Sequence, residues 1–98
     1  MSETFNHIRI LILDDHTLVR RGLQMYIDSV PDMLVVGEAQ INKQAVLQAL
    51  TLCPDVILLI LFTPCQNGLH IATQIRQEQL QTQIIAVTHV AQAEKFFP

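Results

Sequence analysis

The feature that most constrains this chain is the stretch PDVILLILFTP, in which Val56 to Phe62 form seven consecutive apolar residues between Pro54 and Pro64. A membrane-spanning helix needs about 20 such residues, so this run is too short to cross a bilayer. A strand with one solvated face would alternate apolar and polar residues. We therefore expect both faces of this segment to be covered, as in the central strand of a parallel sheet between layers of helices.

The rest of the chain alternates predicted strands with helical patterns. Further strands are expected over IRILIL (8–13), MLVVGEA (33–39, closed by Gly37) and QIIAVTH (83–89). Strands that are separated by helical patterns of about 10–15 residues form right-handed βαβ units. The sequence therefore predicts an α/β fold with a doubly wound parallel sheet, in a single domain over residues 1–98.

Three helices are expected between the strands, each with one apolar face. The first runs from Thr17 to Val30 and ends before Pro31, since the residue before a proline disfavours the helical region. Apolar residues at helical spacing mark the three buried faces: Val19, Leu23, Tyr26, Ile27 and Val30 in the first, Ala45, Ala49, Leu50 and Cys53 in the second, and Ile71, Ala72 and Ile75 in the third. A fourth helix is expected to begin within VAQAEKFFP, residues 90–98.

The composition excludes several classes of protein. Half of the residues are apolar and 15% are charged, which argues against disorder. The net charge of −3 and the pI near 5.7 argue against nucleic-acid binding, because phosphate contacts need a basic face. The N-terminus MSETFNHIR lacks the basic and apolar segments of a signal peptide. We expect a cytoplasmic protein with free thiols and no contact with a membrane.

The order IRILILDDHTLVRRGL … VVGEA … PDVILL … P..NGL … IIAVT resembles the receiver domain of bacterial two-component response regulators. The likeness runs from about Ile8 to His89 and is greatest for the NarL/FixJ type. This resemblance implies a flavodoxin-like sheet in the order 2-1-3-4-5, with ligands bound beyond the carboxyl ends of the strands. It also implies a role in phosphorelay signal transduction, through contacts with other proteins and without enzyme activity.

In that family the first strand ends in an acidic pair that holds Mg²⁺, and Asp14 and Asp15 match this pair. Carboxylate oxygens are ligands that Mg²⁺ prefers. The alternative is that Asp15 caps the first helix while Asp14 lies at a solvated strand end. The family's switch hydroxyl follows the fourth strand, and Thr88 matches it; the alternative is an ordinary β-branched strand residue.

The chain departs from the family at the phosphate acceptor. The family places an aspartate near the end of its third strand, in a pattern like PDVVLLDLxMPxxxG. Set against PDVILLILFTPCQNG, that position is Ile60, which lacks the carboxylate nucleophile that an acyl phosphate requires. Asp55 lies roughly 16 Å away along a strand and on its opposite face, so it cannot substitute. With one of three carboxylates lost, we expect Mg²⁺ binding to be weak or vestigial.

A second departure concerns the far edge of the family's sheet. The family's fifth strand, fifth helix and phosphate-binding lysine have no counterpart before Pro98, so we expect four strands in the order 2-1-3-4. The predicted strand 83–89 then forms an edge that can pair with another chain. We therefore expect a symmetric homodimer. Its predicted interface residues are Ile84, Ile85, Val87, Phe96 and Phe97.

Three functions of different classes follow from these residues. The favoured function is a receiver-like module that acts through protein contacts and is not phosphorylated. The second is a conventional phosphate-accepting receiver, which requires a different alignment at Ile60. The third is a small Mg²⁺-dependent enzyme that uses Asp14 and Asp15, although the sequence supplies neither its nucleophile nor a substrate pocket.

Overall fold

The computed structural model describes residues 7–61, 66–79 and 81–88. Strands and helices alternate through them in the order β1 (Ile8–Leu13), α1 (Thr17–Asp28), β2 (Met33–Ala39), α2 (Lys43–Leu52), β3 (Val56–Leu61), α3 (Gln66–Glu78) and β4 (Gln83–Thr88). The strands form one parallel sheet in the order β2-β1-β3-β4. The predicted α/β class and the predicted strand order 2-1-3-4 are confirmed.

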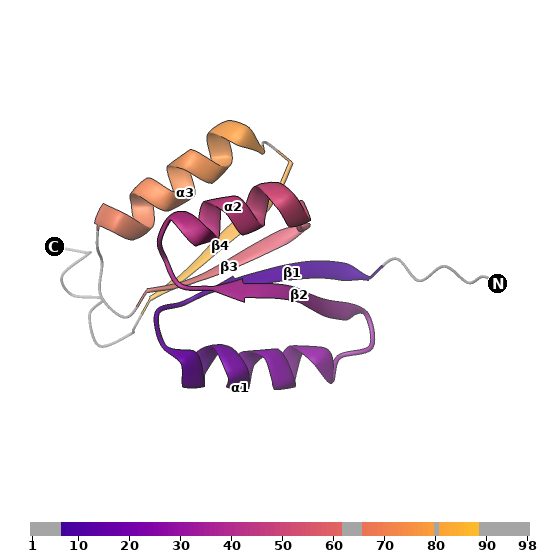
Figure 1. The fold of residues 1–98 in the computed structure, drawn as a ribbon. Coiled ribbons are helices and arrows are strands. Elements are labelled where there is room, and N and C mark those ends of the chain that lie inside the picture. The colour runs from indigo at the N-terminus through magenta and orange to yellow at the C-terminus, as the bar shows by residue number, and fades with distance from the viewer. Residues whose placement is uncertain (1–6, 62–65, 80, 89–98) are drawn as a thin grey trace, which may run out of the picture.

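The sheet lies between two unequal layers of helices. Helices α2 and α3 cover one face, and α1 covers the other (Figure 1). The larger core lies under α2 and α3 and contains Leu11, Leu13, Ala39, Ile41, Ala45, Ala49, Ile57, Leu59, Leu61, Ile71 and Ile75. The smaller core lies under α1 and contains Ile10, Ile12 and Ile27, with Leu23, Met33, Val35, Val56 and Leu58 packed around them.

Val56 to Leu61 of the apolar run form β3, between β1 and β4. Side chains of a strand alternate between the two faces of its sheet. The three that face α2 and α3, at positions 57, 59 and 61, are buried, whereas Val56, Leu58 and Ile60 on the α1 side are only half-buried. The expectation of two covered faces is therefore met fully on one side of β3 and partly on the other.

One irregularity interrupts the pairing of β1 with β2. Ile10 pairs with Val35, but Leu11 pairs with Gly37, so Val36 is an extra residue in β2. Such a bulge bends the strand locally and increases its twist.

Gly37 lies inside β2, because the strand continues to Ala39; the expectation that it closes the strand is wrong. A Cβ atom at Gly37 would lie 2.7 Å from both Gln48 Oε1 and Leu52 Cδ1 of α2. Glycine is therefore needed here for the close approach of α2 to the sheet, not for the end of a strand.

Four details of the helices differ from the sequence prediction. One is Leu50, predicted on the buried face of α2 but 37% exposed. Helix α1 ends at Asp28, two residues earlier than expected, and Ser29 is its C-cap. Tyr26, predicted on the buried face of α1, is 72% exposed. Cys53, predicted on the buried face of α2, is exposed because it is the C-cap and has a φ of 47°. The residues that cap a helix or lie on its flank are determined by the local backbone conformation. The spacing of apolar residues does not reveal that conformation.

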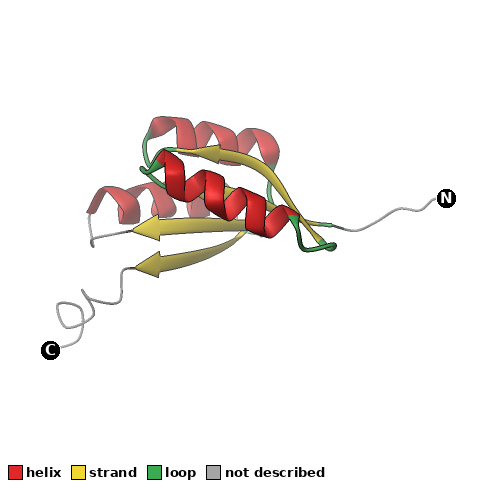
Figure 2. Cartoon of the chain, turned by 90° about the horizontal axis from the view of Figure 1, so that it is seen from below, coloured by secondary structure: helices red, strands yellow, loops and turns green. Residues whose placement is uncertain are grey.

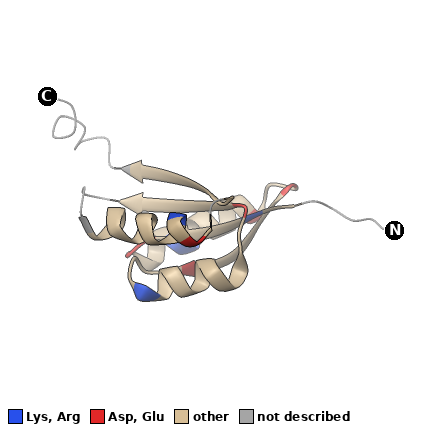
Figure 3. Ribbon diagram, turned by 90° about the horizontal axis from the view of Figure 1, so that it is seen from above, with Lys and Arg blue, Asp and Glu red and all other residues tan. Residues whose placement is uncertain are grey.

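Charged side chains are sparse on the side of the molecule formed by α2, α3 and β4 (Figure 3). The strand from Gln83 to Thr88 carries none. No helix among the described residues has the length and apolar content needed to cross a membrane.

Candidate functional site

The acidic pair lies at the carboxyl edge of the sheet, where β1 ends. Leu13, the last residue of β1, pairs with Leu59 of β3. Asp14 and Ile60 are the next residues of their respective chains, so they lie side by side at this edge. Ile60 is in register with Val87 of β4 on its other side. The position expected for the phosphate acceptor is therefore next to the acidic pair, and an isoleucine occupies it.

Asp14 is fully buried, so the alternative of a solvated strand end is wrong. Its Oδ1 accepts a hydrogen bond from the His16 N–H at 3.1 Å and lies 3.2 Å from His16 Nδ1. Its Oδ2 has no hydrogen-bond partner in the part of the chain that the structure describes. A buried carboxylate oxygen without a partner is costly, so this atom is the one best placed to bind a cation.

Asp15 is exposed and its Oδ1 accepts a hydrogen bond from the Ile41 N–H at 2.9 Å. The carbonyl of Ile41 accepts from Asn67 Nδ2, also at 2.9 Å. The side chains of Asp15 and Asn67 therefore bind the N–H and the carbonyl of Ile41. They connect the β2–α2 loop to the end of β1 and to α3. The N-cap of α1 is His16, which makes no side-chain cap hydrogen bond, so the alternative of Asp15 as the cap is also wrong.

Arg20 fixes α1 against the acidic edge. Its Nε donates to Glu38 Oε1 of β2 at 2.8 Å, and its Nη1 donates to the main-chain carbonyl of Asp14 at 2.6 Å. Arg21 Nε lies 3.4 Å from the other carboxylate oxygen of Glu38. Neither the role of Arg20 nor that of Asn67 is predictable from the sequence, since each depends on contact with a distant element.

The remaining donors suit Mg²⁺ only in part. Asp14 Oδ2 is available, Asp15 Oδ1 is already bonded to a peptide N–H, and Ile60 offers no donor. Across residues 7–61, 66–79 and 81–88, no group of three or more His, Cys, Asp or Glu side chains could hold a metal ion. Mg²⁺ keeps several waters when few carboxylates bind it, so Asp14 would be the principal protein ligand.

Thr88 ends β4 and pairs with Leu61, so the predicted switch position lies at the same edge as Asp14. The Thr88 side chain and the predicted interface residues Phe96 and Phe97 lie outside the described part of the chain.

The other predicted interface residues fall on two different faces of β4. Ile84 is partly buried and packs against the larger core under α2 and α3. Ile85 and Val87 lie on the opposite face and are 50% and 43% exposed. The exposed pair, not Ile84, therefore forms an open apolar surface.

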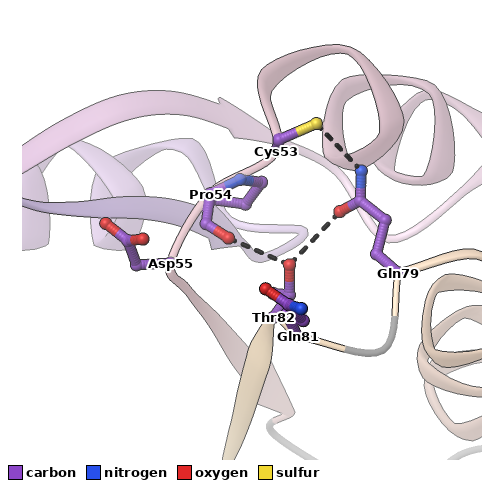
Figure 4. A pocket seen from close by; sticks show the side chains of 6 residues that line it. All are labelled: Cys53, Pro54, Asp55, Gln79, Gln81 and Thr82. Carbon is purple, nitrogen blue, oxygen red and sulfur yellow. Dashed lines mark hydrogen bonds between the residues drawn. The ribbon is translucent and has the colours of Figure 1, made fainter.

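A surface pocket of about 310 Å³ lies at the other end of the sheet, before β3 and β4 (Figure 4). It is lined by Cys53, Pro54, Asp55, Gln79, Gln81 and Thr82. The buried Thr82 hydroxyl donates to the Pro54 carbonyl at 2.9 Å, and Gln79 Nε2 lies 3.3 Å from Cys53 Sγ. Asp55 accepts the Arg9 N–H here at 2.9 Å, at the end of β3 remote from Asp14. These contacts connect α2, α3 and the starts of the strands.

The fold and the site together define a class of protein: a doubly wound α/β domain with acidic residues at the carboxyl edge of a 2-1-3-4 sheet. A family model described as the response regulator receiver domain matches residues 10–97. The chain belongs to this family, whose members act in two-component systems.

Individual relatives agree with the family match. The chain is 37% identical over 91 residues to the transcriptional regulatory protein LiaR of Bacillus subtilis, which covers 93% of this chain and 43% of LiaR. It is 41% identical over 76 residues to the nitrate/nitrite response regulator protein NarL of Escherichia coli K12, covering 78% of this chain and 35% of NarL. The chain thus spans less than half the length of these relatives.

A solved structure shows the same likeness in three dimensions. The receiver domain of the putative response regulator NarL from Mycobacterium tuberculosis superposes with a TM-score of 0.75 at 29% identity. The match covers 92% of this chain and 77% of that structure. The predicted resemblance to NarL-type receivers is confirmed.

Proposed function

We propose that this receiver domain signals through protein contacts without being phosphorylated. The observation that carries the proposal is Ile60, which stands beside the buried Asp14 at the position where the family motif places its acceptor aspartate. Isoleucine has no oxygen to attack phosphorus, so no acyl phosphate can form on it.

The alternative is a conventional phosphate-accepting receiver, which needs another carboxylate as the phosphate acceptor. Asp55 lies at the opposite end of β3, where it accepts the Arg9 N–H. Asp15 is bonded to the Ile41 peptide, and Asp14 is buried. A Mg²⁺-dependent enzyme is supported still less, because none of the residues that the structure describes places a nucleophile beside these acids. We therefore propose a protein without enzyme activity.

The test is exposure of the purified chain to acetyl phosphate and Mg²⁺, followed by intact-mass measurement. We expect no increase by the mass of one phosphoryl group. The Ile60→Asp variant is the matched control, because it regains a carboxylate at the acceptor position. A phosphoryl adduct on any aspartate of the unaltered chain would contradict the proposal.

We also propose that Mg²⁺ binds weakly, with a dissociation constant on the order of millimolar or higher, because few carboxylates remain to hold it. Asp14 supplies the unpartnered oxygen. Titration calorimetry with MgCl₂ would measure the affinity, and micromolar binding by the unaltered chain would contradict this proposal.

The partners that fit this function are proteins, and we propose that one of them is a second copy of the chain. The exposed Ile85 and Val87 support a contact on β4. The net charge of −3 argues against direct binding of nucleic acid. We propose a cytoplasmic location, where two-component regulators meet their kinases.

A further inference from the structure

Strand β2 forms one edge of the sheet, on the side opposite to β4 (Figure 2). It pairs with β1, and among the described residues no strand pairs with its outer side. The segment Met33–Val36 is apolar, and Leu34 within it is 43% exposed. The charged residue of β2 is Glu38, and its carboxylate is paired with Arg20 and Arg21 of α1. An apolar edge strand is a template for a strand of another chain unless its outward backbone groups are blocked.

Two N–H groups of β2 are bonded to the end of α1 and to the α1–β2 connection, and not to β1. The Met33 N–H donates to the Val30 carbonyl at 3.1 Å. The Val35 N–H donates to Asp28 Oδ1, also at 3.1 Å. Because the strands of a sheet hydrogen-bond side by side in its plane, an N–H that is not directed to β1 lies on the outer side of β2. Both donors are therefore unavailable to a strand of another chain.

The far end of β2 is blocked in a similar way. The Ala39 carbonyl accepts the Asp14 N–H on the β1 side, whereas the Glu38 carbonyl accepts from Gln48 Nε2 of α2 at 3.1 Å. Between the two blocked ends, Val36 is the extra residue of the bulge. A bulge bends and twists a strand, and bulges on edge strands turn the edge away from other chains. The outer side of β2 therefore has blocked backbone groups at each end and an irregular middle.

Asp28 is the last residue of α1, where a carboxylate is unfavourable for the helix. The carboxyl end of a helix carries a partial negative charge, which repels an acidic side chain. The last turn of α1 contains no basic residue that would offset this repulsion. The acid at position 28 therefore opposes the stability of the helix that contains it. Its bond to the Val35 N–H is the contact that accounts for its place.

A strand that approached β2 would have to displace the Asp28 carboxylate from the Val35 N–H. The displaced carboxylate would then lie against the new strand with less water and no partner, which is costly for a charged group. Its negative charge would also repel the carbonyl groups of that strand. The hydrogen bond and the charge of Asp28 therefore both oppose pairing at this edge.

We propose that Asp28 is a gatekeeper residue, which closes the β2 edge to strand addition by occupying the Val35 N–H. The kind of partner that it rejects is a chain in the extended conformation, including β2 of a second copy. Protein contacts of this domain are thereby limited to surfaces other than the β2 edge. This inference goes beyond the proposed function, because it concerns neither position 60 nor phosphorylation.

The first test is amide hydrogen exchange of the full chain, measured by NMR. The Val35 N–H should be protected although it lies on an edge, because Asp28 binds it. Asp28→Ala should speed its exchange about two- to tenfold, which is the net effect of one hydrogen bond. Asp28→Asn keeps an acceptor oxygen and should keep most of the protection. Asp32→Ala is the matched control, because it removes one acid from an exposed position of the same connection and should leave Val35 protected.

The second test follows the growth of assemblies larger than a dimer by light scattering and thioflavin T fluorescence. Asp28→Ala should form them at least about threefold faster than the unaltered chain, since a freed apolar edge pairs with other chains. Adding Leu34→Lys to this variant should return the rate to that of Asp32→Ala, because lysine on an edge strand opposes pairing. Circular dichroism and urea unfolding check that each variant is folded, as expected for alanine at a helix end.

Three outcomes would overturn the inference. The first is exchange of the Val35 N–H in the unaltered chain at the rate of an unstructured peptide, which needs no variant. The second is a folded Asp28→Ala variant that exchanges and assembles like Asp32→Ala. The third is assembly of Asp28→Ala that continues unchanged after Leu34→Lys is added, since that assembly would not use β2.

Discussion

Arg20 Nε on α1 donates to Glu38 Oε1 on β2 at 2.8 Å, and the two side chains are only 11% and 20% exposed. The same guanidinium also reaches the Asp14 carbonyl, so one side chain joins α1 to both strands at the acidic edge. A partly buried ion pair with extra hydrogen bonds contributes more than an exposed pair.

We predict that Arg20→Ala lowers the free energy of unfolding by about 1–3 kcal/mol, because it removes hydrogen bonds made by a charged donor. Arg21→Ala is the control, since Arg21 is 67% exposed, and it should change stability by no more than about 0.5 kcal/mol. Urea unfolding followed by circular dichroism measures both. Equal losses for the two variants would contradict the prediction.

A second prediction concerns the close contact of α2 with β2. Gly37→Ala should lower the free energy of unfolding by about 1–2 kcal/mol, because the new methyl group would displace Gln48 and Leu52. Gly22→Ala is its control: a Cβ there meets nothing within 4 Å, and alanine in a helix should raise stability by about 0.5–1 kcal/mol. Opposite signs are expected in the same unfolding assay; a stable Gly37→Ala variant would show that α2 can move at no cost.

The third prediction concerns the acceptor position. Ile60→Asp should lower the free energy of unfolding by about 1–3 kcal/mol without metal, because it places a second carboxylate beside the buried Asp14. Mg²⁺ should restore part of this loss, since a ligand that binds only the folded state stabilises it. Ile60→Asn keeps the shape without the charge, and it should lose stability without responding to Mg²⁺. Thermal unfolding with and without MgCl₂ separates these outcomes, and a Mg²⁺ response of Ile60→Asn equal to that of Ile60→Asp would speak against the site.

The fourth prediction concerns the pocket at the other end of the sheet. Thr82→Val should lower the free energy of unfolding by about 1–2 kcal/mol, because the buried Pro54 carbonyl loses the hydroxyl that donates to it. Thr51→Val, at an exposed position of α2, should change stability by no more than about 0.5 kcal/mol. Differential scanning calorimetry of the two variants compares them directly.

The architecture was predictable because the spacing of several apolar residues indicates which face of each helix or strand is buried. The bounds of β1 and β2 agree with the sequence prediction, and the strand order followed from the family resemblance. The details of single residues were less accessible. Tyr26 fits the apolar period of α1, yet it is 72% exposed. The spacing of apolar residues alone does not show which flank of a helix packs against another element.

The candidate site was predictable in its location but not in its bonding. The parallel pairing of β1 with β3 places Asp14 and Ile60 next to each other at the strand ends. This placement does not depend on the contacts that their side chains make. Asp14 is bonded to His16 and Arg20, two and six residues further along the chain, but its full burial is a feature of the folded domain. The bond of Asp15 depends on where Ile41 lies in the β2–α2 connection. Asp15 and Ile41 are 26 residues apart, so no local pattern contains this contact.

The central place of β1 has a consequence for biosynthesis. It is synthesised before both of its neighbours, β2 and β3, and β3 is complete only at Leu61. At roughly 5–20 residues per second of translation, the nascent chain exposes the apolar residues Ile10 to Leu13 for several seconds before a sheet can close on them. Parallel pairing cannot begin with a local hairpin. We therefore expect this small domain to depend on chaperone protection during synthesis more than a helical bundle of equal length does.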